Sequence, residues 1–136
     1  MNRKNVRSIS LAVQSLFYVA AGINHFWHSR VYVAVMPDHY SHPYGLVLLS
    51  GAVEIVLGLG LMLKQTRRVS AFGLIGMLVV YFDVHVFMLG NPQRFPAIPF
   101  WVLEGRIPLQ FLLIGWAANY VGKGSLAKPE VTPQEG

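Results

Sequence analysis

Hydrophobic residues gather into four blocks along the chain, at about 9–27, 44–63, 69–89 and 98–121. Each block is close to the roughly 20 residues that a helix needs to cross the hydrocarbon core of a bilayer. Helix is the structure expected for each block, because lipid offers the backbone no hydrogen-bonding partners. The pattern therefore predicts an all-α protein, a four-helix transmembrane bundle formed by residues 8–121.

The connecting segments fit this arrangement. Residues 1–7 read as a basic N-terminal tail, and residues 122–136 contain no apolar run and read as a disordered tail. The loop 64–68 is short, so the second and third helices should form an antiparallel hairpin. The segments 28–43 and 90–99 contain several prolines, which stop helices and favour turns.

Basic residues lie mainly on one side of the expected bundle. Eight of the 11 lysines and arginines fall on the two tails or the loop 64–68, and only Arg30, Arg94 and Arg106 lie at or near the other face. Cytoplasmic loops carry such an excess. We expect an integral protein of the cytoplasmic (inner) membrane with both termini in the cytoplasm and the lipid bilayer as a partner. The placement argues against a nucleic-acid partner, although the formal net charge is +5.

Two alternative interpretations are weaker, one of the whole chain and one of its first apolar block. A soluble bundle would need polar helix faces, but charged residues make only 12% of the chain. A signal peptide would fit the basic start and a cleavage site at Val19-Ala20-Ala21, but the apolar run continues to Trp27.

Each block contains polar residues that helical spacing places on faces suited to helix packing. Glu54 is the only charged residue in its block, and a charge at the bilayer centre costs roughly 3 kcal/mol, so it should face other protein. It shares a stripe with Gly51 and Gly58, and small residues mark helix contacts in lipid. Similar stripes carry the other members: His25 with Tyr18, Ala21 and Gly22; Asp83 with Gly73, Gly76 and Val80; Arg106 and Gln110 with Leu103 and Ala117.

The expected cluster of His25, Glu54, Asp83, Arg106 and Gln110 lies in the outer half of the bundle and has two interpretations. In the first, the cluster is structural, and Arg106 neutralises Glu54. In the second, it forms a ligand-binding pocket or a proton relay, since ionisable groups inside membranes usually have functions. Both interpretations stay open from the sequence.

No motif points to a cofactor held by the chain. Cysteine is absent, which excludes disulfides, thiol chemistry and Cys metal ligands. Haem between His25 and His85, or a metal held by His25, His28, His39 or His42, is a weaker alternative. His85 lies about 160° around its helix from Asp83, so the two cannot share one interior face. We therefore expect no metal and no cofactor in the chain itself.

Several short strings resemble the DoxX-like family of small membrane proteins, over about residues 15–120. They are Ala21-Gly-Ile-Asn-His25-Phe26, Met36-Pro37, Ser50-Gly51-Ala-Val-Glu54-Ile-Val-Leu-Gly58, Thr66-Arg67-Arg68 and Arg106-Ile-Pro108-Leu-Gln110. The resemblance implies a four-helix membrane bundle and an association with redox systems. Where many relatives carry a Pro-Ala-Asn-like turn, this chain has Phe82-Asp83-Val84-His85, so a shared activity there is in doubt.

Together these observations predict an accessory component of a membrane redox or quinone/oxidative-stress system. Such a component would bind a small quinone-like or lipophilic molecule and receive electrons from a membrane or periplasmic partner protein. The alternative is a non-catalytic membrane chaperone or assembly factor whose polar cluster is structural. Whether the chain is an enzyme, and whether it forms a homo-oligomer, stays open.

Overall fold

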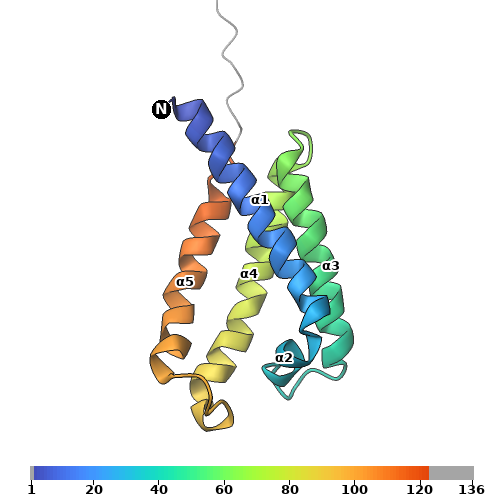
Figure 1. The fold of residues 1–136 in the computed structure, drawn as a ribbon, viewed down its shortest axis with the longest axis vertical. Helices are drawn as coiled ribbons and strands as arrows, with labels where there is room; N and C mark the ends of the chain where they lie inside the picture. Colours follow the sequence, from blue (N-terminus) through green and yellow to red (C-terminus); the bar gives the residue numbers. More distant parts are fainter. Residues whose placement is uncertain (1, 123–136) are drawn as a thin grey trace, which may run out of the picture.

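The computed structural model describes residues 2–122, and within them the chain is helical and contains no strand. Four long helices lie within these residues, and Figure 1 shows a short helix at one end of them. The elements are α1 (Arg3–Trp27), α2 (Ser29–Ala34), α3 (Pro43–Met62), α4 (Arg67–Gly90), the 3-10 turn η1 (Pro92–Arg94) and α5 (Phe100–Ala118). The all-α prediction is confirmed, and each expected block contains one long helix.

Two segments differ from the sequence-based expectation. Helix α1 begins at Arg3, so most of the segment expected as a basic tail is helical, and the Asn2 side chain caps it by accepting from the Lys4 backbone N–H (3.2 Å). The segment 28–43, expected as a loop, contains α2, which is separated from α1 by the non-helical backbone of His28 (φ −116°, ψ 37°). The tail expected over 122–136 lies outside the described residues from position 123 onward.

Three of the long helices, α1, α3 and α4, are long and apolar enough to cross a membrane. Helix α3 has 20 residues, which at about 1.5 Å per residue matches a hydrocarbon core of roughly 30 Å. Helix α5 has 19 residues and is not among the three. It carries Glu104, Arg106, Pro108 and Gln110, which lower its apolar character.

Helices α1 and α3 pack more extensively than any other two helices of the described residues, because glycines at their contact let the backbones approach. A Cβ on Gly22 would lie 2.6 Å from the Gly51 carbonyl oxygen, and one on Gly51 would lie 2.6 Å from the Cβ of His25. Gly58 continues the contact farther along α3, where its carbonyl oxygen accepts a hydrogen bond from the Ser15 hydroxyl (2.7 Å). The predicted Gly51–Glu54–Gly58 face is therefore buried against α1, and it brings His25 onto α3.

Helix α4 packs against both α3 and α5, and α1 meets α5 at the end of the bundle that carries the chain's N-terminus. There the Ser10 hydroxyl oxygen accepts from the Trp116 indole N–H (2.9 Å) and from the Tyr120 hydroxyl (2.8 Å). We call this the N-terminal end. The opposite end, which holds α2 and η1, we call the α2 end; toward it α1 and α5 diverge in Figure 1.

The stripe predicted for α4 is wrong. The buried residues of this helix are Ser70, Ala71, Leu74, Leu78 and Met88, whereas Val80 is 59% exposed and Asp83 is exposed. Because α4 is apolar nearly all round, it has no polar face that would fix its rotation. Its glycines predicted a face other than the one that is buried. Of the two glycines in the expected stripe, Gly73 approaches the Leu57 side chain, whereas a Cβ on Gly76 would meet nothing of the described chain within 4 Å.

A polar pocket at the α2 end of the bundle

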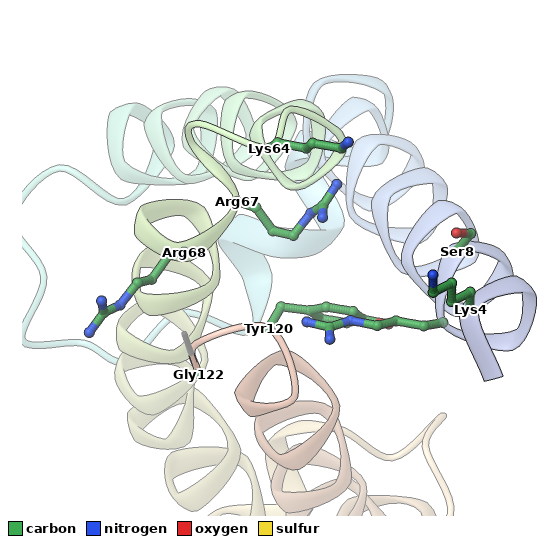
Figure 2. A pocket seen from close by; sticks show the side chains of 8 residues that line it. Lys4, Ser8, Lys64, Arg67, Arg68, Tyr120 and Gly122 are labelled. Atoms are coloured by element: carbon green, nitrogen blue, oxygen red, sulfur yellow. The ribbon is translucent and has the colours of Figure 1, made fainter. Parts of the chain in front are cut away.

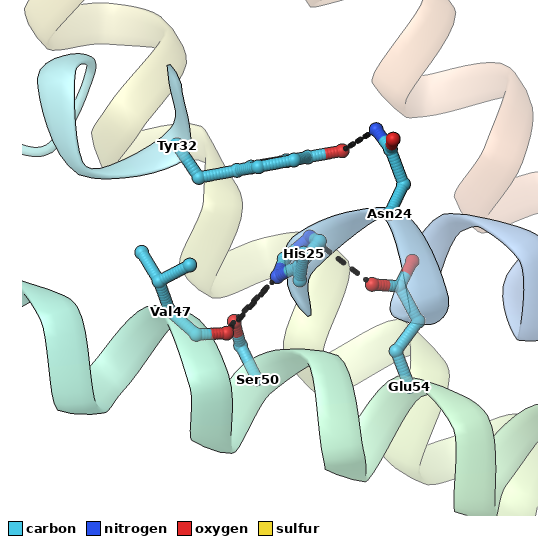
Figure 3. Close-up of polar contacts among 6 residues, drawn as sticks. All are labelled: Asn24, His25, Tyr32, Val47, Ser50 and Glu54. Carbon is cyan, nitrogen blue, oxygen red and sulfur yellow. Dashed lines mark hydrogen bonds and ion pairs between the residues drawn. The ribbon is translucent and has the colours of Figure 1, made fainter. Parts of the chain in front are cut away.

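His25 and Glu54 meet in the contact between α1 and α3 (Figure 3). The Nε2 atom of His25 lies 3.4 Å from Oε2 of Glu54, and the two side chains are 8% and 5% exposed. On its other side, Nδ1 of His25 lies 3.1 Å from the Val47 carbonyl oxygen and 2.9 Å from the Ser50 hydroxyl. The contact fixes the imidazole against α3 from both ring nitrogens.

This geometry limits where protons can reside. A backbone carbonyl only accepts, so the contact with Val47 favours the form of His25 in which Nδ1 carries a hydrogen. The Ser50 hydroxyl donates to the same carbonyl (2.8 Å). Nε2 then meets the Glu54 carboxyl group, and two lone pairs would face each other unless one of the groups is protonated. In that form, a favourable contact between Nε2 and the Glu54 carboxyl group requires a proton on one of the two groups.

Helix α2 covers the imidazole. The ring of Tyr32 lies 4.0 Å, centroid to centroid, from the ring of His25. The Tyr32 hydroxyl accepts from the Asn24 side-chain amide (2.8 Å), and the Asn24 carbonyl oxygen lies 2.6 Å from Nδ1 of His28. Figure 3 shows Tyr32 and Asn24 on the side of His25 opposite α3. The end of α1 and α2 thus form a polar cover over the site.

Helix α4 supplies Tyr81 and His85. The Tyr81 hydroxyl is buried and lies near Glu54 and Ser50, but its geometry makes no hydrogen bond to either. One turn later, Nε2 of His85 lies 3.2 Å from the Gln110 carbonyl oxygen, while its Nδ1 is buried without a partner among the described residues. The Gln110 amide donates to the Leu78 carbonyl (2.6 Å), which fixes its orientation.

Arg106 of α5 completes the ring of polar residues. Its one hydrogen bond among the described residues goes from Nη1 to the weak acceptor Sδ of Met88, at 3.5 Å. A guanidinium has five N–H donors, so most of the donors of this half-buried side chain are uncommitted there.

These side chains enclose a cavity of about 90 Å³, which we call the polar pocket. Its polar walls are His25, Tyr32, Ser50, Tyr81, His85 and Arg106. The volume is several times the roughly 10–15 Å³ that one water needs. An apolar hollow of about 240 Å³ between α3 and α4 shares Met36, Ser50, Tyr81 and Val84 with it. A hollow of about 390 Å³ at the α2 end shares Tyr32, Val35 and Arg106.

Several buried polar atoms have no hydrogen-bond partner among residues 2–122, and two of them belong to residues of the pocket wall. In the described part of the chain they are Oε2 of Glu54, both side-chain polar atoms of Gln14, Nδ1 of His85 and the hydroxyls of Tyr18 and Tyr81. A buried polar group without a partner costs about 1–3 kcal/mol. The two in the wall, the Tyr81 hydroxyl and Nδ1 of His85, suit a pocket that takes up a polar molecule or water.

The sequence-predicted residues divide into three groups. His25 and Glu54 are in contact with each other. Gln110 contacts His85, and His85 lines the pocket together with Arg106. Among the described residues Arg106 makes no ion pair with Glu54, so the expected pairing of these two charges is wrong. The reason is that α5 packs on α4, whereas Glu54 faces α1.

Asp83 does not join the pocket. Its Oδ2 accepts from the Tyr40 hydroxyl (2.7 Å) and lies 2.8 Å from Nε2 of His39, both in the segment after α2. The hydrogen bond to Asp83 raises the pKa of the Tyr40 phenol. A second tie joins Arg94 to Asp38 through two hydrogen bonds (2.6 and 3.1 Å), and it holds the pKa of the Asp38 carboxyl group below its usual value. These contacts fasten the segment over α4 and η1.

Sequence reasoning missed three wall residues, Tyr32, Ser50 and Tyr81, and considered a fourth, His85, only as a weaker haem alternative. Ser50 precedes Glu54 by four positions, and Tyr81 precedes His85 by four, so each pair shares a helix face. That spacing was the available signal. The expectation of no metal in the chain stays a prediction; residues 2–122 contain no group of three or more His, Asp or Glu side chains placed to hold a metal.

The fold and site together define a class: an all-helical protein with three helices able to cross a membrane and a polar pocket between its helices. Residues 14–121 match the family described as Domain of unknown function (DUF8561), and the chain belongs to that family. The matched segment runs from within α1 past the end of α5. No curated protein and no solved structure matches the chain.

Proposed function

We propose that this chain is an integral protein of the cytoplasmic membrane in which α5 forms a fourth span beside α1, α3 and α4. Both chain ends and the loop between α3 and α4 then lie in the cytoplasm, and the α2 end faces outward. The support is the placement of eight of the 11 basic residues on one side. The polar pocket lies in the outer half of this bundle.

The proposed activity is binding of a small lipophilic molecule that has a polar, oxygen-bearing head, such as a quinone. The observation that carries it is the shared wall between the polar pocket and the apolar hollow between α3 and α4. Val53, Val80 and Leu49 line that hollow and are each at least 40% exposed, so in a bilayer they border lipid. An apolar body would occupy the hollow while its head enters the pocket.

The pocket has the groups that such a head requires. Arg106 carries uncommitted donors, the Tyr81 hydroxyl has no partner among the described residues, and Ser50 borders both spaces. The proton held between His25 and Glu54 lies beside the pocket and can move to a reduced oxygen. Electrons must come from a redox partner protein, because the chain has no cysteine and no evident cofactor motif.

The redox context rests on the resemblance to DoxX-like proteins and is part of the proposal. A second candidate, an assembly factor with a structural polar cluster, draws on the bonds already made by His25 and Gln110 to the backbone of α3 and α4. In that case a stoichiometric membrane client would copurify with a protein whose pocket takes up no lipophilic molecule.

The test is binding of a decyl-substituted benzoquinone to the full-length protein, measured by native mass spectrometry from mild detergent. We expect one molecule per chain. Val80→Phe occupies part of the apolar hollow and should weaken binding about tenfold, which corresponds to about 1.4 kcal/mol. Val79→Phe is the matched control, since Val79 is 54% exposed and is not in the wall of that hollow.

Absence of binding, or an equal effect of the two phenylalanine variants, would contradict the proposal. A similar loss of affinity in Arg106→Gln, with Arg30→Gln unchanged, would assign the polar head to the pocket. Arg30 is exposed on α2 and is not among the residues of the pocket wall.

A further inference from the structure

The N-terminal end of the bundle contains a basic hollow of about 550 Å³, separate from the polar pocket. Its basic lining residues are Lys4 and Arg7 from the start of α1 and Lys64, Arg67 and Arg68 from the α3–α4 loop and the start of α4. Figure 2 shows Lys4, Lys64, Arg67 and Tyr120 around one space, with Arg68 directed away from it. Two segments some 60 positions apart in sequence therefore contribute positive charge to one concave surface.

Local contacts hold two of these side chains in place. The Arg67 guanidinium donates from Nε to the Leu61 carbonyl (2.9 Å) and from Nη2 to the Met62 carbonyl (3.2 Å), at the end of α3. The Arg7 guanidinium carbon lies 5.8 Å from the centre of the Tyr120 ring, within reach of a cation–π contact. Both keep further N–H donors available toward the hollow.

No acidic residue lines the hollow, and none of its basic residues makes an ion pair within residues 2–122. Like charges gathered without a counter-charge repel one another. The positive-inside tendency accounts for the number of basic residues on this side, but it does not require that distant segments converge around one space. A bound anion would offset the repulsion.

We propose that this basic hollow binds an anion through a phosphate group. Arginine and lysine are the residues that suit phosphate, arginine by paired N–H donors and lysine as a point charge. The Ser8 hydroxyl, which also lines the hollow, adds a neutral donor. The phosphate belongs either to the headgroup of an anionic lipid in the adjacent leaflet or to a soluble phosphate compound, and the chemistry of recognition is the same.

The experiment uses the full-length protein in mild detergent and native mass spectrometry. Phosphatidylglycerol, phosphatidylcholine with the same acyl chains, and inorganic pyrophosphate are the three probes. We compare Lys4→Gln/Lys64→Gln with Arg30→Gln, which removes an exposed charge at the α2 end, and with Lys4→Arg/Lys64→Arg, which keeps both charges. Neither lysine side chain makes a hydrogen bond within the described residues, so folding should survive, and far-ultraviolet circular dichroism checks it.

We expect one phosphatidylglycerol per chain, with affinity at least about tenfold weaker in the double glutamine variant and unchanged in the other two. Preference for phosphatidylglycerol over phosphatidylcholine assigns the site to anionic lipid. Saturable pyrophosphate binding that displaces the lipid assigns it to soluble phosphate compounds. If the double glutamine variant does not fold, Lys64→Gln alone serves, since one charge still weakens binding. Equal binding by all variants, or none of any probe, overturns the proposal.

Discussion

Nε2 of His25 lies 3.4 Å from Oε2 of Glu54, so the buried carboxyl group of Glu54 contacts an imidazole of α1 rather than the guanidinium of Arg106. This contact depends on Gly22 and Gly51, which let α1 and α3 approach until backbone and Cβ atoms nearly touch. The opposite nitrogen of the imidazole is bound to the backbone of α3. His25 therefore takes part both in the packing of α1 on α3 and in the contact with the Glu54 carboxyl group.

The first prediction is that Glu54 is coupled energetically to His25 and not to Arg106. Contacting residues show coupling free energies of about 0.5–3 kcal/mol, and residues without shared contacts show nearly none. We expect a coupling in this range between His25→Leu and Glu54→Gln, and one near zero between Arg106→Gln and Glu54→Gln. Thermal unfolding of the single and double variants in detergent measures both cycles. A large coupling of Arg106 with Glu54 would mean that the two charges meet after all.

The second prediction concerns the close approach of α1 and α3. Gly51→Ala places a methyl group 2.6 Å from the Cβ of His25 and 2.8 Å from the Gly22 carbonyl, so the helices must separate. We expect a loss of about 1–3 kcal/mol in unfolding free energy, as for other overpacked sites. Gly76→Ala is the control on α4, where an added Cβ meets nothing within 4 Å. Equal effects of the two changes would show that the α1–α3 contact is looser than described.

The third prediction uses the tie between Tyr40 and Asp83. The hydrogen bond to the carboxylate raises the pKa of Tyr40 above its ordinary value of 10.0, so the neutral phenol is favoured when the segment is docked. The stabilising contribution is present below pH 10 and is lost as pH rises through the raised pKa. In Asp83→Asn, Tyr40 should ionise at lower pH than in the native protein. NMR of ¹³C-labelled tyrosine measures this, with Tyr44, which makes no contact with Asp83, as the internal reference. An unchanged Tyr40 titration would argue against the contact.

Helix positions were predictable from sequence because apolar blocks of about 20 residues are typical of helices long enough to cross a membrane. The six-residue α2 was not, because so short a helix has no periodicity to detect and lies among polar residues and prolines. The failure to predict α2 mattered, because this helix supplies Tyr32 to the pocket.

Partners between helices were harder to predict than the helices themselves. Glu54 and His25 were both placed on packing faces, because glycine spacing marks the α1–α3 contact. On α4 the glycine spacing was misleading, because Gly76 meets no neighbour in the described chain, so Asp83 was turned inward in error, Tyr81 was overlooked and His85 was set aside. Spacing and depth describe a residue's face and level, but they do not say which helices are neighbours.

The last prediction tests topology, including the proposed crossing by α5. The chain contains no cysteine, so single cysteines can be introduced without removing any. A membrane-impermeant maleimide added to intact cells should label Ser41→Cys and Gln93→Cys, at the α2 end, and should label Gln65→Cys only after the membrane is opened. All three positions are exposed in the fold, so burial cannot explain a difference.

Gly122→Cys, just beyond α5, then decides whether α5 forms a fourth span. It should behave as Gln65→Cys does, because α5 returns the chain to the cytoplasm. Labelling of Gly122→Cys in intact cells, with Gln93→Cys also labelled, would leave α5 on the outer side and reduce the protein to three spans. Labelling of Gln65→Cys in intact cells, with Ser41→Cys and Gln93→Cys unlabelled, would reverse the orientation and move the polar pocket to the cytoplasmic half.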